Sequence, residues 1–473
     1  MLVDRYPPAQ LFALVPQLMA DFEPVLRELD RLLDDDEIFT RTKADLARRA
    51  PHTLTRGRPS TPVEVILRLL VVKRLYGWSY EALEHFVSDS LVLRQFCRVY
   101  LKRVPDDTTL LRWANLIAPA TLAALNERVV DLARGLKVTR GRKLRVDSTV
   151  VETTIHHPSD SSLLADGVRV VSRLLRRART VLGAASSLGK AVFRTRIRST
   201  RRLVQSLHRL GRRKGEEASQ VMQQTYARLI DVVRKTQVQA AKVNAVLRTR
   251  SDAAALRLAR QIAVVTPRIE QVLAQTVRRV LKGETVPASE KILSLFEPHS
   301  QIIVRHKAGK PVEFGRKLWL EEVDGGIVSG WRLLDQAGQD TPYLLPSLAA
   351  HQARFGKPPW LVAGDRGIAS PENEARAIQA GVRRVVIPAA GRRSSPERGR
   401  MEKQRWFRHG FRFRAGIEGR ISVLQRCYGL DRCRDHDEAG MGRWVGWGIV
   451  TANLERIART QAARTATPAA KAA

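Results

Sequence analysis

A long helical segment separates the parts of this sequence that have the pattern of β-strands. Residues 163–282 repeat apolar side chains at helical spacing and contain few glycines. Residues 143–151, before this segment, alternate in polarity and are rich in β-branched side chains, which predicts a strand. More strands are expected after it, at 300–304, 317–323 and 327–334. A sheet made from these strands must therefore form across an inserted helical domain.

The remaining pattern after residue 290 alternates between short strands and helices. Asp324-Gly325-Gly326 is a strong hairpin signal between the second and third of the strands just named. We also expect strands at 360–365 and 384–388, helices at 343–354, 373–380, 414–427 and 441–460, and a loop at 389–410. This order predicts an α/β fold in which a mixed sheet is flanked by helices.

Positive charge is concentrated in the helical segment. The chain has 82 Lys and Arg against 47 Asp and Glu, a formal net charge of +35. Residues 169–282 hold 27 of the basic residues and only five acidic ones, so their net charge is +22. A solvated helix face explains a few extra lysines but not this excess, which predicts contact with DNA or RNA. The candidate contact residues are Arg194, Arg196, Arg198, Arg201, Arg202, Arg212, Arg213 and Lys214.

The N-terminal part of the chain, residues 1–135, reads as a helical domain. Leu11, Leu14 and Leu18 recur at helical spacing, and Thr61 with Pro62 marks the start of a later helix. Short helices joined by Gly or Pro turns over residues 57–115 are compatible with a helix-turn-helix unit. We therefore expect this domain to bind DNA ends.

Composition places the chain among intracellular globular proteins. The hydrophobic fraction of 44% excludes a wholly disordered or collagen-like chain. Three cysteines do not make a disulfide scaffold and fit a reducing cytoplasm. We find no apolar run of 18 residues and no signal peptide, so no membrane association is expected. Residues 461–473 are expected to form a disordered tail.

Three acidic residues are candidates for catalysis. Asp147 and Asp365 lie at or near interior strands, and strand ends are where side chains converge on a ligand. Glu418 shares one face of a predicted helix with Phe411, Arg414 and, seven residues later, Gln425. Three convergent carboxylates suit Mg²⁺ or Mn²⁺, and two such ions about 4 Å apart promote phosphodiester displacement.

These motifs resemble those of the DDE transposases of bacterial insertion sequences. The first-Asp motif is Val146-Asp147-Ser148-Thr149, and Ala363-Gly364-Asp365-Arg366-Gly367 is similar to the second. Phe411-x2-Arg414-x3-Glu418-x6-Gln425 resembles the Tyr-Arg-Glu-Lys signature, with Phe in place of Tyr and Gln in place of Lys. Longer stretches, 146–166 and 291–330, resemble the ISNCY-type group, and residues 57–115 resemble the N-terminal helical domain of these enzymes.

The resemblance implies a fold and an activity. It implies an RNase H-like catalytic domain, formed by residues 141–162 and 291–460, with a basic helical insertion at 163–290. Asp147, Asp365 and Glu418 would hold two Mg²⁺ or Mn²⁺ ions, and Arg414 would contact a phosphate. We expect further DNA contacts from Arg366, Arg426 and Trp406. Hydrolysis at the transposon ends would expose a 3′-hydroxyl that attacks target DNA, carried out by a homodimer on paired ends at the bacterial nucleoid.

Two other functions share parts of this pattern. An RNase H-like metal nuclease without strand transfer would use the same acids, and a transposase-derived DNA-binding protein would need none of them. Glu152 is expected to be a strand-surface residue rather than a further catalytic acid, and His156-His157 to lie in a loop. Cys427, Cys433 and His436 lack the spacing of a zinc site. Trp319 and Trp331 are expected in the core.

Overall fold

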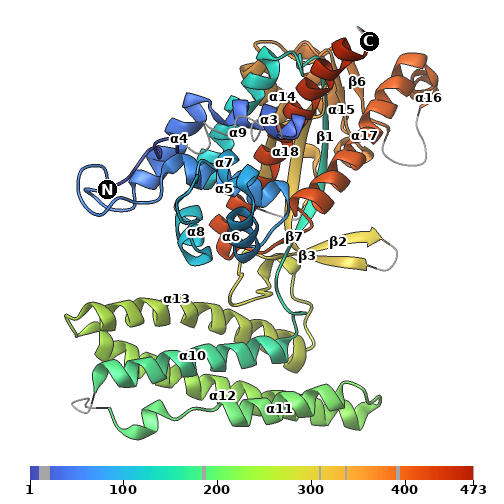
Figure 1. Cartoon of the computed structure of the whole chain (residues 1–473). Helices are drawn as coiled ribbons and strands as arrows, with labels where there is room; N and C mark the ends of the chain where they lie inside the picture. Colours follow the sequence, from blue (N-terminus) through green and yellow to red (C-terminus); the bar gives the residue numbers. More distant parts are fainter. Residues whose placement is uncertain (10–21, 184–187, 308–309, 336–337, 390–394, 472–473) are drawn as a thin grey trace. The chain divides into compact units, whose positions relative to one another are not determined.

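The chain forms two compact units (Figure 1). The computed structural model describes all residues except 10–21, 184–187, 308–309, 336–337, 390–394 and 472–473. The first unit contains Met1–Glu152 and Arg316–Ala473, and the second contains Thr153–Gly315. The second unit is thus wider than the 163–290 insertion expected from the pattern, because it also includes strand β2 and the first part of β3.

Most strands of a mixed sheet belong to the first unit, whereas β2 and the first part of β3 belong to the second. In the described residues, the strand order is β2-β3-β1-β5-β6, with β4 paired to β3 and β7 paired to β1. Strands β1 and β5 are parallel, as are β5 and β6, whereas β3 runs antiparallel to both β2 and β4. The strands are β1 (Lys143–Thr153), β2 (Gln301–Lys307), β3 (Lys310–Val323), β4 (Ile327–Leu333), β5 (Leu361–Ala363), β6 (Arg384–Val386) and β7 (Arg432–Cys433).

The hairpin between β3 and β4 forms where the sequence predicts it. Gly325 and Gly326 both have positive φ, at 86° and 79°, which residues with a side chain rarely adopt. The Asp324 carboxylate accepts hydrogen bonds from the backbone amides of Arg140 and Lys143, at 2.9 and 3.0 Å. The turn thereby fixes the start of β1 against the hairpin.

Helices surround this sheet in the C-terminal half of the chain. They are α14 (Leu344–Phe355), α15 (Pro371–Gln379), α16 (Pro396–Lys403), α17 (Arg405–Tyr428) and α18 (Asp437–Lys471), with short 3₁₀ turns η4 (Thr341–Tyr343) and η5 (Arg366–Ile368). The first unit is therefore a mixed α/β structure with many helices.

Two expectations for this half were wrong. The loop predicted over 389–410 contains α16, and α17 begins at Arg405, nine residues before its predicted start, because Phe407 and Gly410 pack onto the sheet. The tail predicted over 461–473 continues α18 to Lys471. Gln461 and Arg464 there donate hydrogen bonds to the Leu136 carbonyl, which anchors the alanine-rich helix end.

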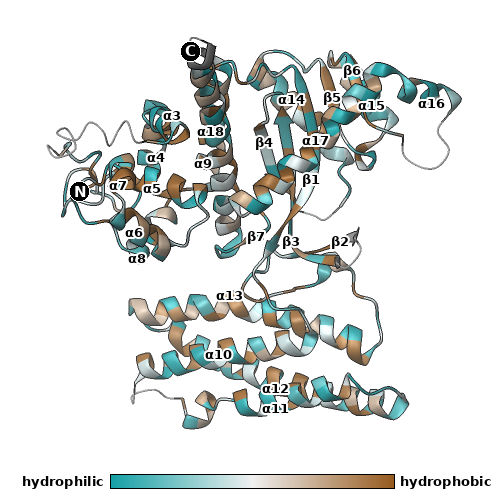
Figure 2. Ribbon diagram, turned by 45° about the vertical axis from the view of Figure 1, so that its right-hand side comes forward, coloured by the Kyte–Doolittle hydropathy of each residue, from teal (hydrophilic) through white to brown (hydrophobic). Residues whose placement is uncertain are grey.

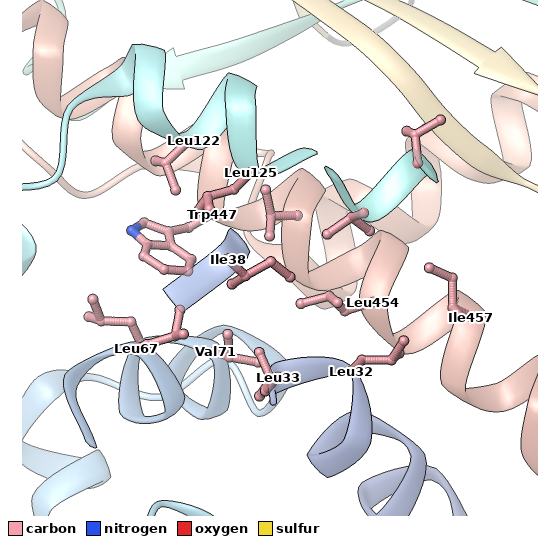
Figure 3. Packing of buried hydrophobic residues seen from close by; sticks show 14 of the residues in the cluster. Leu32, Leu33, Ile38, Leu67, Val71, Leu122, Leu125, Trp447, Leu454 and Ile457 are labelled. Carbon is pink, nitrogen blue, oxygen red and sulfur yellow. The ribbon is translucent and has the colours of Figure 1, made fainter. Parts of the chain in front are cut away.

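The N-terminal helices pack against α18. Leu32, Leu67, Leu122, Trp447 and Leu454 come from four helices and meet in one buried core (Figure 3). The helices are α3 (Pro24–Leu33), α4 (Asp36–Ala47), α5 (Val63–Leu75), α6 (Tyr80–Asp89), α7 (Leu91–Phe96), α8 (Asp107–Ala114) and α9 (Pro119–Gly135). The predicted Leu11, Leu14 and Leu18 stripe lies outside the described residues.

One buried arginine organises the N-terminal helices. The Arg68 side chain on α5 is fully buried, and its guanidinium lies 2.7 Å from Asp30 and 2.5 Å from Asp34. Glu64, one turn earlier on α5, is 3.3 Å away. A buried charge is tolerated only when it is paired, so these carboxylates make the burial of Arg68 possible.

The described residues between Asp160 and Thr276, in the second unit, form a bundle of long helices, as the helical periodicity predicts. They are α10 (Asp160–Leu182), α11 (Ile197–Leu210), α12 (Glu216–Arg248) and α13 (Ala253–Thr276), with short turns η1 (Lys190–Phe193), η2 (Val277–Leu281) and η3 (Ala288–Glu290). Hydrophobic and hydrophilic residues alternate along each helix in Figure 2, and the apolar ones form a separate core. Where the chain enters and leaves this bundle, the Thr153 and Ser300 hydroxyls lie 2.7 Å apart and form a hydrogen bond.

No helix in the described part of the chain is long and apolar enough to cross a membrane.

Candidate functional site

Two of the predicted acids lie at the same edge of the sheet. Strands β1 and β5 are parallel, and their last recorded pair joins Arg145 to Ala363. Asp147 and Asp365 each follow that pair by two residues, so they reach the same level on neighbouring strands. Strand β1 continues to Thr153, so Asp147 lies within its strand, whereas Asp365 lies just beyond the end of β5. The parallel register brings the two carboxylates close enough for Asp365 to raise the pKa of Asp147.

Asp147 is held in a largely buried position on β1, with its side chain 13% exposed. Burial raises the pKa of Asp147 to about 6, and the nearby carboxylates of Asp365 and Asp340 add to the rise. The backbone amide of Ser148, which donates to Oδ1 at 2.8 Å, and the guanidinium of Arg414 oppose it. A nearby cation stabilises such a poorly solvated carboxylate more than it stabilises a carboxylate in water.

Asp365 begins a tight turn that exposes its neighbours. Its side chain accepts a hydrogen bond from the Gly367 amide at 2.9 Å and so caps η5. Arg366 points outward from the same turn and is exposed. A side chain at Gly364 would collide with Ile368, since a Cβ there would lie 2.0 Å from the Ile368 Cδ1. The small residues around Asp365 are therefore required by the turn.

Helix α17 carries Glu418 and Arg414 past the sheet edge at close range. A Cβ at Gly410 would lie 2.5 Å from the Val386 Cγ2, and a Cβ at Gly416 would lie 2.3 Å from Arg145 Nη1. These glycines let the helix backbone approach β6 and β1. Arg145 in turn donates to the Phe413 carbonyl at 2.5 Å, which fixes the helix along β1.

Arg414 links two of the three predicted acids. Its Nη2 lies 3.2 Å from the Asp147 Oδ2, and its Nη1 lies 2.8 Å from the Glu418 Oε1. The Arg414 side chain is 15% exposed, whereas that of Glu418 is 66% exposed. The helical spacing of four residues between Arg414 and Glu418 therefore produces an ion pair that is anchored on the strand by Asp147.

A fourth acid near the site was missed by the sequence analysis. Asp340, just before η4, accepts a hydrogen bond from the Ser148 hydroxyl at 2.7 Å and pairs with Lys317 at 2.7 Å. It also contributes to the raised pKa of Asp147. No motif surrounds Asp340, and its position depends on how β3 and the loop after β4 fold. The only local signal was its place before the predicted helix at 343–354.

The other positions of the signature have structural partners. Gln425 Nε2 donates to the Thr149 hydroxyl at 3.1 Å, so the residue at this position binds the strand that carries Asp147. Phe411 is exposed on α17, and Arg426 is exposed one residue after Gln425. The Trp406 ring is half-buried beneath the Arg384 guanidinium, which lies 4.4 Å from the ring centroid.

The site does not present a ready metal cage. Among the described residues, no group of three His, Cys, Asp or Glu side chains lies close enough to hold a metal ion. Asp147 and Asp365 fit a divalent cation because they are carboxylates in mutual repulsion. Glu418 forms an ion pair with Arg414. For Glu418 to bind a metal ion together with Asp147 and Asp365, the Arg414 side chain must therefore move.

The remaining candidates lie elsewhere. In the second unit, the predicted basic residues at 194–214 are exposed, apart from Arg196, which is half-buried. Glu152 pairs with Arg432 at 2.8 Å, and its side chain is 15% exposed. His156 lies 3.5 Å from Asp166, and His157 packs edge-on against Phe314. Trp319 is fully buried and Trp331 half-buried.

Comparison with known proteins gives one finding for the N-terminal helices. Residues 16–116 match the family model described as a transposase domain (DUF772). This match supports a transposase role for the chain. No curated protein and no solved structure matches it.

Proposed function

We propose that this chain is a DDE transposase that cuts DNA at transposon ends and joins the exposed 3′-hydroxyl to target DNA. The observation that carries the proposal is the placement of Asp147 and Asp365 at one sheet edge, with Glu418 on the helix beside it. The transposase-domain match at residues 16–116 supports the same family from a different part of the chain. In DDE enzymes, the three acids occupy a first strand, a later central strand and a helix; in this chain Asp147 lies on β1, Asp365 lies two residues after the end of β5, and Glu418 lies on α17.

The proposed catalytic domain is RNase H-like, and Asp147, Asp365 and Glu418 are its proposed metal ligands. Bound Mg²⁺ or Mn²⁺ would activate the attacking oxygen and stabilise the leaving oxygen of the phosphodiester. Asp147 supplies a carboxylate whose negative charge is poorly solvated, which favours cation binding. Asp340 orients Ser148, the residue that follows Asp147, through its hydroxyl.

Arg414 is the proposed phosphate-binding residue. Its Nε is buried and has no hydrogen-bond partner among the described residues, so a donor is left when both terminal nitrogens are engaged. A phosphate is the anion whose geometry suits a guanidinium. A DNA phosphate would compete with Glu418 for Arg414. Once the phosphate is bound, Glu418 would be free to bind the metal ion, so DNA binding would promote formation of the complete metal site.

The basic bundle is the proposed DNA-binding surface of the second unit. Exposed arginines on and around α11 carry no compensating acids nearby in the sequence, since residues 190–215 contain none. Such a surface binds phosphates without reading sequence. Arg366, Arg426 and Trp406 are proposed to contact DNA near the acids, and two copies of the chain are proposed to act on paired ends.

A cleavage assay tests the function. Supercoiled DNA that carries the gene with its native flanks is incubated with purified protein and Mg²⁺. We expect breaks that map to the flanks and joined products, both absent with Asp147→Asn and retained with Glu152→Gln, a matched change on the same strand. Breaks at scattered positions would favour a plain nuclease. Tight binding without breaks in either Mg²⁺ or Mn²⁺ would favour a DNA-binding protein.

A further inference from the structure

A cavity of about 1030 Å³ lies in the first unit, next to the C-terminal end of α17. Its walls come from the N-terminal helices α5, α6 and α8 on one side, and from α17, α18 and the segments on either side of β7 on the other. The volume is at the upper end for small-molecule pockets and exceeds what a simple ion needs. None of the acids proposed for catalysis lines it.

A buried lysine without an ionic partner faces this cavity. Lys73, on α5, is only 8% exposed. Its ammonium lies 4.4 Å from the Tyr80 ring centroid and 5.5 Å from that of Trp444. Among the described residues, the Lys73 ammonium makes no hydrogen bond or ion pair. Burial lowers the pKa of Lys73 to about 8; the nearby Arg74 and Arg434 lower it as well, and the Asp435 carboxylate opposes them.

A second cation in the wall is also incompletely paired. Arg443, on α18, is half-buried, and its Nε is buried without a hydrogen-bond partner in the described part of the chain. The neighbouring Arg74 differs, because it donates to the Trp444 carbonyl at 2.6 Å and the Tyr428 carbonyl at 3.4 Å. Structural pairing thus satisfies Arg74 and leaves Lys73 and Arg443 with unused donors.

The surrounding groups favour an anion that carries an aromatic or apolar part. Ser79 and Tyr80 begin α6 at the cavity wall, so the positive end of that helix adds to the two cations. Trp78, Tyr80 and Leu111 supply an apolar wall. Asp431, Asp435 and Asp437 also line the cavity and limit its net positive charge. An anion with a compact charge and an apolar body fits this combination better than a bare ion does.

We propose that the cavity binds one nucleotide, with its phosphate between Lys73 and Arg443 and its base against the Trp78 and Tyr80 side. The nucleotide belongs either to an unpaired stretch of a DNA strand or to a free nucleotide in solution. Gln425, at the cavity, lies seven residues after Glu418 on α17, which is about 10 Å along the helix. A strand whose nucleotide occupied the cavity would therefore pass close to the proposed acids.

Equilibrium dialysis of the full chain with radiolabelled deoxyadenosine monophosphate tests this proposal. We expect saturable binding of one molecule per chain, and at least tenfold weaker binding of deoxyadenosine, which lacks the phosphate. Lys73→Met and Arg443→Gln should each weaken binding at least tenfold, whereas Lys102→Met, which removes an exposed charge, should not. Absence of saturable binding, or equal binding by Lys73→Met and Lys102→Met, would overturn the proposal.

Thermal unfolding separates a binding role for Lys73 from a structural one. Because Met fills a similar volume without a charge, Lys73→Met should unfold at the same or a higher temperature than the wild type. Two results together would refute the site. Lost binding with a lower unfolding temperature in Lys73→Met would assign Lys73 a structural role, and unchanged binding in Arg443→Gln would show that Arg443 does not contact the nucleotide.

Competition identifies the source of the nucleotide. A short single-stranded oligodeoxynucleotide that displaces the labelled monophosphate from wild type points to a strand, and failure to displace it points to a free nucleotide. The proposal does not depend on the catalytic assignment, since Asp147→Asn should bind the monophosphate as wild type does. Loss of cleavage and loss of nucleotide binding are therefore separate results.

Discussion

Replacing Asp147 with asparagine should make the first unit more stable at neutral pH. Asparagine has the shape of the aspartate but no charge, so it removes the poorly solvated carboxylate from β1. The pKa of Asp147 is raised from 3.8 to about 6, chiefly by burial, even with Arg414 3.2 Å away. A rise of about two units at about 1.4 kcal/mol per unit corresponds to about 3 kcal/mol.

The sign of the pH dependence follows from the direction of the shift. Between pH 4 and pH 6, the folded chain holds a proton on Asp147 that the unfolded chain has released, so wild-type stability falls as pH rises through this window. Well above pH 6, Asp147 is ionised in both states, and the full free-energy cost of its buried carboxylate is present. The advantage of Asp147→Asn should therefore be about 2–3 kcal/mol at pH 7.5 and under about 1 kcal/mol at pH 4.

Urea unfolding followed by tryptophan fluorescence measures this difference. All eight tryptophans lie within the residues of the first unit, at positions 78, 113, 319, 331, 360, 406, 444 and 447, so the signal reports that unit alone. Asp131→Asn, on the exposed face of α9, is the matched control and should change stability by under about 0.5 kcal/mol. An Asp147→Asn variant that is less stable than wild type at pH 7.5, or whose advantage does not change with pH, would refute the reasoning.

Three further predictions concern other parts of the chain. Arg68→Ala should lower the free energy of unfolding by about 2–4 kcal/mol, measured by urea titration, because it removes a fully buried side chain and leaves Arg98 as the remaining cation beside both Asp30 and Glu64. A loss below about 1 kcal/mol would contradict this pairing. Gly410→Ala should lower stability by about 1–3 kcal/mol and reduce cleavage, because the new methyl group pushes α17 away from Val386; unchanged cleavage would show that the helix position is not critical. The third change replaces four bundle arginines with glutamine, at Arg198, Arg201, Arg202 and Arg213. It should weaken DNA binding, measured by fluorescence anisotropy, and reduce the slope of log affinity against log salt by up to about 3.6. An unchanged slope would rule out a phosphate-binding role for these arginines.

Local sequence patterns predicted those parts of the fold that depend on neighbouring residues. The Asp324-Gly325-Gly326 hairpin forms as expected because two adjacent glycines permit positive φ with little dependence on the rest of the chain. The bundle helices follow their apolar periodicity for the same reason. Asp147 was correctly placed on a strand from its β-branched neighbours, whereas the strand predicted to end at Asp365 ends at Ala363, two residues earlier.

The errors arose where tertiary contacts override local preference. Residues 395–410 are polar and include glycine, which favours a loop, but Phe407 and Gly410 pack on β5 and β6 and keep the segment helical. Asp340 was missed because its hydrogen bond to Ser148 joins residues 192 apart in the sequence. The pairing of Arg414 with Asp147, 267 residues apart, was equally invisible to helical spacing, which revealed only the Arg414–Glu418 contact.

The hydrogen bond between Thr153 and Ser300 has a consequence for how this chain can change over evolution. It holds the two ends of a segment of well over a hundred residues within contact distance of each other. For the rest of the fold, the entire bundle is then equivalent to a surface loop, and the entropy of closing a loop grows only with the logarithm of its length. Helices can be lengthened, exchanged or deleted as a block without altering the separation that β1 and β3 require. The bundle can therefore diverge rapidly in sequence and size while the sheet that carries the acids stays the same.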